Sequence, residues 1–146
     1  MRTDATDARA RDHEPARRPS DAARGRVLVV DDDAAVRSVL SLALARHDVV
    51  TAADGGSALS LIDAQADFDL VLCDVAMPVM GGVELWMELG LVRPELLPRF
   101  VFMTGGAMSR GDRLFLGAGT VEVLYKPIPT EVLRSLLGTR MAERHA

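Results

Sequence analysis

Short apolar runs alternate with segments of helical periodicity along this chain, and that alternation limits the folds it can adopt. Parallel strands need crossover connections, usually helices, so the alternation predicts a parallel sheet. The runs are apolar at consecutive positions, which indicates strands covered by helices on both faces. We therefore expect an α/β, flavodoxin-like doubly wound fold, with five parallel strands in the order 2-1-3-4-5. The predicted strands are 26–31, 48–52, 68–73, 99–104 and 121–125, and the predicted helices are 34–46, 57–66, 83–92, 110–116 and 130–141.

The length and net charge of the chain limit the classes of protein to which it can belong. The chain has 146 residues, which suits one domain, and we assign that domain to residues 26–146. Its net charge of −4 argues against nucleic-acid binding, since phosphate contacts need a basic surface. No run approaches the roughly 18 apolar residues of a membrane span, and the N-terminus lacks an apolar signal core, so we expect a cytoplasmic protein without a membrane partner. Residues 1–25 carry six arginines and five acids, which predicts a disordered tail.

Polar residues follow four of the predicted strands. Strand 1 runs into Asp31-Asp32-Asp33, strand 3 into Asp74, strand 4 into Thr104-Gly105 and strand 5 into Lys126-Pro127. In this fold, ligands bind outside the carboxyl ends of the strands. Clustered carboxylates repel one another unless a cation lies among them, and oxygen-only ligands favour Mg²⁺. Carboxylates, metal, lysine and hydroxyl together predict a phosphoryl-transfer site in which a carboxylate is the nucleophile.

Lys126 is the only lysine, whereas the other 16 basic residues are arginines. A compact ammonium suits a crowded phosphoryl site better than a planar guanidinium does. The position of this lysine, at a strand end and before a proline, strengthens the assignment.

Four motifs together resemble the receiver domains of two-component response regulators, and particularly receivers attached to hybrid histidine kinases. The motifs are VLVVDDD (27–33), LVLCDVAMPVMGG (70–82), VFMTGG (101–106) and LYKPI (124–128). The resemblance implies a domain that takes a phosphoryl group from a histidine kinase or histidine phosphotransfer protein and signals to a downstream protein, without being an enzyme itself.

The resemblance also implies a role for each matching residue. Asp74 would be the phosphoacceptor, Asp32 a direct Mg²⁺ ligand, Asp31 a ligand through water, and the backbone carbonyl of Ala76 a further ligand. The remaining roles fall to Thr104 as switch hydroxyl with Gly105 beside it, Lys126 as phosphoryl contact, Pro127 after a cis bond, and Pro78 with Gly81 and Gly82 as shapers of the acceptor loop.

Two features depart from the family pattern. Relatives carry an aromatic residue three positions before the lysine, where this chain has Val123 and places Tyr125 next to the lysine instead. Only 20 residues follow Lys126, so we expect no output domain and signalling by protein–protein contact.

Two other functions remain open at this point. One is a receiver-like interaction module that is not phosphorylated. This function stays open because Val123 replaces the aromatic residue that relatives carry at that position. The other is a small phosphatase with an aspartyl nucleophile, although the acceptor site reads Asp74-Val75-Ala76 and lacks the second acid of the DxD pattern.

Several residues have simpler structural interpretations. We expect Asp33 to begin the first helix, His47 to act as a favourable charge at a helix C-terminus, and Thr130 to cap the last helix. We expect Cys73 to be a small buried hydrophobe, Trp86 to lie in helix core, and at least one of Leu114, Phe115 and Leu116 to be exposed.

Overall fold

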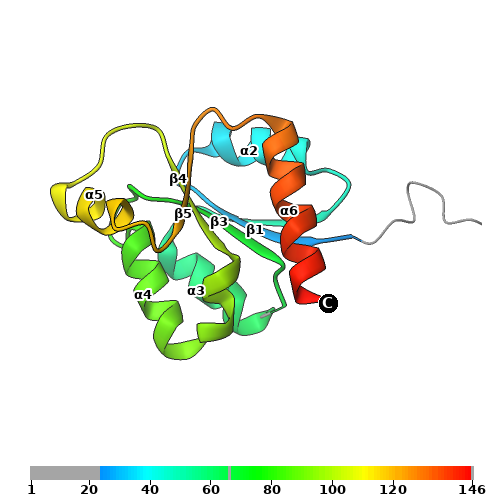
Figure 1. Ribbon diagram of the computed structural model, residues 1–146, viewed down its shortest axis with the longest axis horizontal. Coiled ribbons are helices and arrows are strands. Elements are labelled where there is room, and N and C mark those ends of the chain that lie inside the picture. Colours follow the sequence, from blue (N-terminus) through cyan, green and yellow to red (C-terminus); the bar gives the residue numbers. More distant parts are fainter. Residues whose placement is uncertain (1–23, 66, 146) are drawn as a thin grey trace, which may run out of the picture.

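A parallel five-stranded sheet forms the centre of the protein, in the order β2-β1-β3-β4-β5, as predicted (Figure 1). The computed structural model describes residues 24–65 and 67–145. All four strand pairings are parallel. The strands are β1 (Arg26–Val30), β2 (Asp48–Ala52), β3 (Leu70–Asp74), β4 (Phe100–Thr104) and β5 (Glu122–Tyr125).

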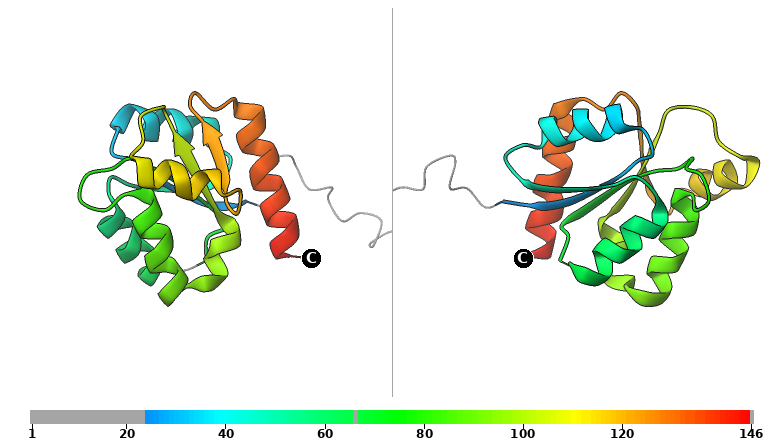
Figure 2. Two further views of the ribbon diagram at one scale, coloured as in Figure 1. Left: turned by 60° about the vertical axis from the view of Figure 1, so that its left-hand side comes forward. Right: turned by 180° about the vertical axis from the view of Figure 1, so that it is seen from behind.

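Helices cover both faces of the sheet (Figure 2). One face packs against α2 and α6, and the other against α3 and α4, with α5 beside α4 at the β5 edge. The helices are α2 (Ala34–Ala43), α3 (Gly55–Ala64), α4 (Gly82–Val92), α5 (Arg110–Gly117) and α6 (Thr130–Arg144), and a 3-10 helix, η2 (Pro94–Arg99), precedes β4.

The continuous apolar runs follow from this two-sided burial. In β1, Leu28 and Val30 enter the core beneath α3 and α4, whereas Val27 and Val29 enter the core beneath α2 and α6. Strands β3 and β4 divide in the same way and are buried at every position. Side chains alternate between the faces of a strand, so a strand covered on both sides is apolar throughout. Cys73 is fully buried in this core, as predicted.

Several element boundaries differ from the prediction. The helix predicted over 57–66 begins two residues earlier, at Gly55, because Asp54 caps α3 by accepting a hydrogen bond from the backbone of Ser57 at 2.7 Å. Helix α2 ends at Ala43 rather than Arg46. The 3-10 helix was not predicted.

The last helix also differs. Its cap is Pro129, and Thr130 is its first residue, so the predicted threonine cap is wrong. The helix continues past Met141 to Arg144, whose guanidinium lies 2.9 Å from the buried carboxylate of Asp69. That ion pair ties the last turn of α6 to the start of β3.

Most of the predicted tail, residues 1–23, lies outside the described residues. Gly25, assigned to that tail, instead belongs to the fold. It is buried, and its carbonyl accepts a hydrogen bond from the backbone of Asp48 at 2.9 Å. Within the described residues, no helix combines the length and the apolar character needed to cross a membrane.

His47 has a different role from the one predicted. Its Nδ1 accepts a hydrogen bond from the backbone N–H of Gly25 at 2.9 Å, which requires an unprotonated nitrogen. Burial, followed by the charges of Arg46 and Arg24, lowers the pKa of His47, although Asp48 and Asp69 oppose the shift. The imidazole therefore acts as a neutral acceptor rather than as a charge at the helix end.

This assignment predicts a pH-dependent stability. Because folding lowers the pKa of His47, the unfolded chain binds the proton more readily, and stability present above about pH 6.5 is lost as the pH falls through the folded pKa. The variant His47→Asn keeps an acceptor but does not titrate. Urea denaturation between pH 7.5 and 5 should show the wild type losing more unfolding free energy than His47→Asn. Equal losses would contradict this role.

Candidate functional site

Three carboxylates meet at the carboxyl edge of the sheet. Val30 of β1 pairs with Cys73 of β3, so the residues that follow them, Asp31 and Asp74, lie side by side. Asp31 is fully buried and Asp74 is 7% exposed, whereas Asp32 faces solvent. One carboxylate oxygen from each of Asp31, Asp32 and Asp74 lies within 4.8 Å of the others. The fold thus gathers the acids that the sequence places at the ends of strands 1 and 3.

Lys126 enters this cluster from the far side of β4. Its Nζ lies 2.6 Å from Oδ2 of Asp31 and 3.2 Å from Oδ1 of Asp74. The backbone N–H of Lys126 donates to the carbonyl of Thr104 at 2.8 Å, which sets the point where the chain leaves β5. The peptide bond to Pro127 is cis, as expected. One ammonium therefore bridges carboxylates from two strands.

The charges in this cluster do not balance. Burial, followed by the charge of Asp31, raises the pKa of Asp74, although Lys126 opposes the shift. Burial alone would lower the pKa of Lys126, but its hydrogen bond to Asp31 and the charge of Asp74 raise it. With Asp32 included, three carboxylates face one ammonium. An all-oxygen donor set with excess negative charge fits a hard divalent cation such as Mg²⁺.

Asp31 is held rigidly in place. Its Oδ1 accepts a hydrogen bond from the backbone of Asp33 at 2.9 Å, and its carbonyl accepts one from the Arg37 guanidinium at 2.8 Å. Asp33 itself caps α2 by accepting from the backbone of Ala35, which confirms the prediction that it begins this helix. The contribution of Arg37 was not predicted, because its only sequence signal is a basic residue in the second turn of a helix.

Thr104 and Gly105 lie at the end of β4. Thr104 is buried, and its Oγ1 accepts a hydrogen bond from the backbone of Gly106 at 3.3 Å. The hydroxyl hydrogen of Thr104 is not used in that contact. A Cβ added at Gly105 would meet Cδ of Lys126 at 3.9 Å, an ordinary contact. Packing within the fold therefore does not require a glycine at position 105.

Close backbone contacts constrain the loop from β3 to α4 more than the segment around Gly105. The backbone of Gly82 donates to the carbonyl of Val75 at 2.9 Å, and a Cβ at Gly82 would lie 2.3 Å from the carbonyl oxygen of Asp74. Only glycine allows α4 to begin so close to the acid. Ala76 and Pro78 lie on this loop and are exposed.

The position of the usual family aromatic is occupied by Val123, which is partly buried against the core beneath α3 and α4. Tyr125 is 71% exposed. In the same region the rings of Trp86 on α4 and Phe115 on α5 are in edge contact, with centroids 5.1 Å apart. Trp86 therefore packs at the margin of the core, and Leu114 is exposed, as predicted.

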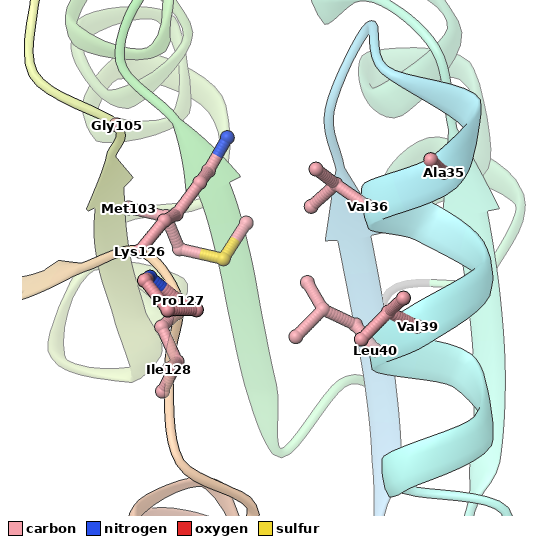
Figure 3. Close-up of a pocket in the computed structure, with 9 residues that line it drawn as sticks. All are labelled: Ala35, Val36, Val39, Leu40, Met103, Gly105, Lys126, Pro127 and Ile128. Atoms are coloured by element: carbon pink, nitrogen blue, oxygen red, sulfur yellow. The ribbon is translucent and has the colours of Figure 1, made fainter.

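An apolar groove adjoins the cluster (Figure 3). It has a volume of about 370 Å³ and separates α2 from the chain segment after β5. Val36 and Leu40 point from α2 toward Met103 and Ile128 on the other side. Lys126 lines the groove and also reaches the carboxylates, so a molecule seated there would lie next to Asp74.

Comparisons with known proteins show which family this sequence and fold resemble. The family model described as response regulator receiver domain matches residues 27–138. The chain is 37% identical over 106 residues to the two-component response regulator ORR13 of Oryza sativa subsp. japonica, which covers 70% of this chain and 86% of that protein. The solved structure of chemotaxis protein CheY4 from Vibrio cholerae has 31% identity and a TM-score of 0.67, covering 80% of this chain and 98% of that chain.

Other relatives are much longer than the matched region. The chain is 30% identical over 121 residues to a probable cyclic di-GMP phosphodiesterase of Vibrio cholerae, which covers 82% of this chain but only 27% of that protein. It likewise spans 29% of the response regulator ARR14 of Arabidopsis thaliana. Because the family model covers more than half of this sequence, from residue 27 to residue 138, the chain belongs to the response regulator receiver domain family.

Proposed function

We propose that this chain is a phosphoacceptor in a two-component or phosphorelay system, taking a phosphoryl group from a phosphohistidine onto Asp74 with the help of Mg²⁺. The observation that carries the proposal is a buried aspartate with Asp31 and Asp32 close by and the Lys126 ammonium at 3.2 Å. That arrangement supplies a nucleophile, cation ligands and a fixed positive charge within one cluster. We assign the acceptor domain to residues 26–146, with Gly25 as part of its fold, and place it in the cytoplasm.

Each residue has a distinct role in this proposal. Asp31, Asp32, Asp74 and the Ala76 carbonyl hold the cation, which when bound offsets negative charge on the phosphoryl oxygens. A carboxylate oxygen of Asp74 forms the new bond to phosphorus, while the bond from phosphorus to the donor imidazole nitrogen breaks and its electron pair stays on that nitrogen. The transfer leaves an acyl phosphate on Asp74 and a neutral imidazole on the donor, because either the other ring nitrogen already carries a proton or the released nitrogen takes one from solvent.

Two further groups would hold the transferred phosphoryl group. Lys126 can shift its ammonium from the bare carboxylate of Asp74 to a phosphoryl oxygen without leaving Asp31, from which it lies 2.6 Å away. The hydroxyl of Thr104 can donate to a second phosphoryl oxygen while its oxygen still accepts from Gly106. Such charge-assisted contacts favour the phosphorylated state.

The groove beside Lys126 suits the donor protein. We assign it to an apolar helix face that carries the phosphohistidine, because a segment seated against α2 would bring its imidazole to Asp74. Val39 and Leu42, which are 65% and 79% exposed, extend the apolar surface of α2. The net charge of −4 gives no support for a nucleic-acid partner. The downstream step is a protein–protein contact.

The two alternatives are weaker on specific grounds. A module that is not phosphorylated would not need the buried, mutually repelling acids Asp31 and Asp74 around a lysine. A phosphatase would need a second acid two residues after the nucleophile, and that position is Ala76.

Labelling tests the proposal directly. After incubation with phosphoramidate and Mg²⁺, intact-protein mass spectrometry should show one added phosphate on the wild type and none on Asp74→Asn. Lys126→Arg should be labelled roughly 100-fold more slowly, as expected when one fixed electrostatic contact to the transition state is lost. The matched control is Asp33→Asn, which removes a neighbouring exposed charge but keeps a helix cap, and should label normally. Normal labelling of Asp74→Asn would refute the assignment.

Repulsion between the clustered carboxylates predicts that Asp74→Asn, although it abolishes labelling, raises the stability of the protein. In the absence of Mg²⁺, Asp74→Asn should be more stable than the wild type by about 1 kcal/mol, because the buried carboxylate faces Asp31. Mg²⁺ at ten times its Kd should stabilise the wild type by about 1.4 kcal/mol and leave Asp74→Asn almost unchanged. Urea denaturation with and without Mg²⁺ measures both effects.

The exposed residue Asp63 provides the control for that experiment, since Asp63→Asn removes a charge on α3 outside the cluster. It should respond to Mg²⁺ as the wild type does. A destabilised Asp74→Asn, or one that Mg²⁺ still stabilises fully, would contradict the proposed cation site.

The groove can be tested apart from the chemistry. Val39→Lys should slow transfer from a phosphorylated histidine phosphotransfer protein by about tenfold, equivalent to about 1.4 kcal/mol, while labelling by phosphoramidate stays unchanged. The donor is whichever member of a purified panel labels the wild type. Leu91→Lys, at an 82% exposed site on α4, is the control and should transfer normally. Equal rates for Val39→Lys and wild type would overturn the docking site.

A further inference from the structure

The loop between β3 and α4 contains a strained turn close to the phosphoacceptor. Val79 has φ of 69°, in the left-handed region, and its side chain is fully exposed. The backbone of Met80 donates to the carbonyl of Pro78 at 2.8 Å, which closes a three-residue turn around Val79. A β-branched residue in this region is strained by on the order of 1–3 kcal/mol, and such strain persists only where surrounding contacts impose it.

Val79 makes no such contact itself, since its side chain is in solvent. The next residue does. Met80 packs against Gly55, the buried first residue of α3. A Cβ built on Gly55 would lie 2.7 Å from both Cγ and Sδ of Met80 and 2.9 Å from its Cβ. Because Gly55 has no side chain, it leaves a recess beside the start of α3, and Met80 fills this recess along most of its length. We call this recess the seat of Met80.

The start of α3, which forms this seat, is held in place by the rest of the fold. Asp54 caps α3 by accepting from the backbone of Ser57 at 2.7 Å, and the helix is anchored in the core by Ala58 and Ile62. The base of the loop is closed by the hydrogen bond from the backbone of Gly82 to the carbonyl of Val75 at 2.9 Å. Ala76, whose carbonyl we assign to the cation, lies between Val75 at this base and Met80 on Gly55.

We propose that Met80, seated on Gly55, is a positioning residue that holds the strained turn and thereby aims the Ala76 carbonyl at Mg²⁺. This inference rests on the proposed function. Met80 touches neither the cation nor the phosphoryl group; it acts through the loop. The aspartates Asp31 and Asp74 are anchored by the sheet and by Lys126, so loosening the loop leaves these ligands in place.

The proposal predicts how Mg²⁺ affinity responds to the seat. Met80→Ala empties it, and Gly55→Ala blocks it by placing a methyl group where Met80 lies. Each should weaken Mg²⁺ binding by about tenfold, the low end of the effect of residues that orient metal ligands. In the double variant the new methyl group at position 55 occupies space that the shortened side chain at position 80 has left. The double variant should therefore lose much less Mg²⁺ affinity than the roughly hundredfold expected if the two single effects multiplied. Met80→Leu, which keeps the bulk of the side chain, should bind nearly as the wild type.

Isothermal titration calorimetry of the whole chain with Mg²⁺ measures these affinities. The control is Ile62→Val, which loosens α3 within the core and should lower stability without changing Mg²⁺ affinity. Hydrogen exchange of metal-free protein gives a second measurement: amides of residues 75–82 should exchange faster in Met80→Ala than in Ile62→Val. If Gly55→Ala does not fold, Met80→Ala alone decides, because it only removes atoms from a partly exposed side chain.

The outcomes separate this inference from the function on which it rests. If the wild type binds Mg²⁺ and Asp32→Asn does not, the cation site stands. Unchanged affinity in Met80→Ala and Gly55→Ala would then overturn only the positioning role. Weaker binding in Ile62→Val equal to that in Met80→Ala would also overturn it, because general loosening would explain both. A wild type that does not bind Mg²⁺ would overturn both proposals.

Discussion

The ammonium of Lys126 between two buried carboxylates is the interaction on which the site depends. Asp31 and Asp74 come from neighbouring strands and would repel each other strongly if nothing lay between them. Lys126 lies 2.6 Å and 3.2 Å from their oxygens and reaches them from the edge strand. The parallel sheet is what makes this contact possible, because it brings the carboxyl ends of β1, β3 and β5 to one edge. Asp32 adds a third negative charge, so the donor set of the cluster fits a divalent cation.

The sheet order and the clustering of acids could be predicted because both follow from local patterns. Strands that are apolar throughout must be covered on both faces, and acids placed directly after such strands must meet at one edge. The need for glycine at positions 82 and 55 could not be predicted in the same way. It arises from the close approach of Gly82 to the carbonyl of Asp74 and of Gly55 to Met80, which are contacts between separate elements.

His47 illustrates a second limit of sequence interpretation. A histidine near a helix end suggests a favourable charge, but its function depends on what lies opposite. Here that is the backbone N–H of Gly25, a residue assigned to the tail, and the imidazole is held neutral to accept from it. The end of α6 was misplaced for a related reason. Arg144 pairs with Asp69, which is distant in sequence, and that partner extends the helix beyond its apolar face.

In the proposed reaction a carboxylate oxygen of Asp74, and no other atom of the cluster, receives the phosphoryl group. Borohydride reduces an acyl phosphate to an alcohol, so a phosphorylated aspartate becomes homoserine at its own position. The wild type should therefore be treated with phosphoramidate and Mg²⁺, reduced, digested and mapped by mass spectrometry. We predict homoserine at position 74 only, and none when Mg²⁺ is chelated. Homoserine at position 31 or 32, or equal amounts with and without Mg²⁺, would contradict the central claim.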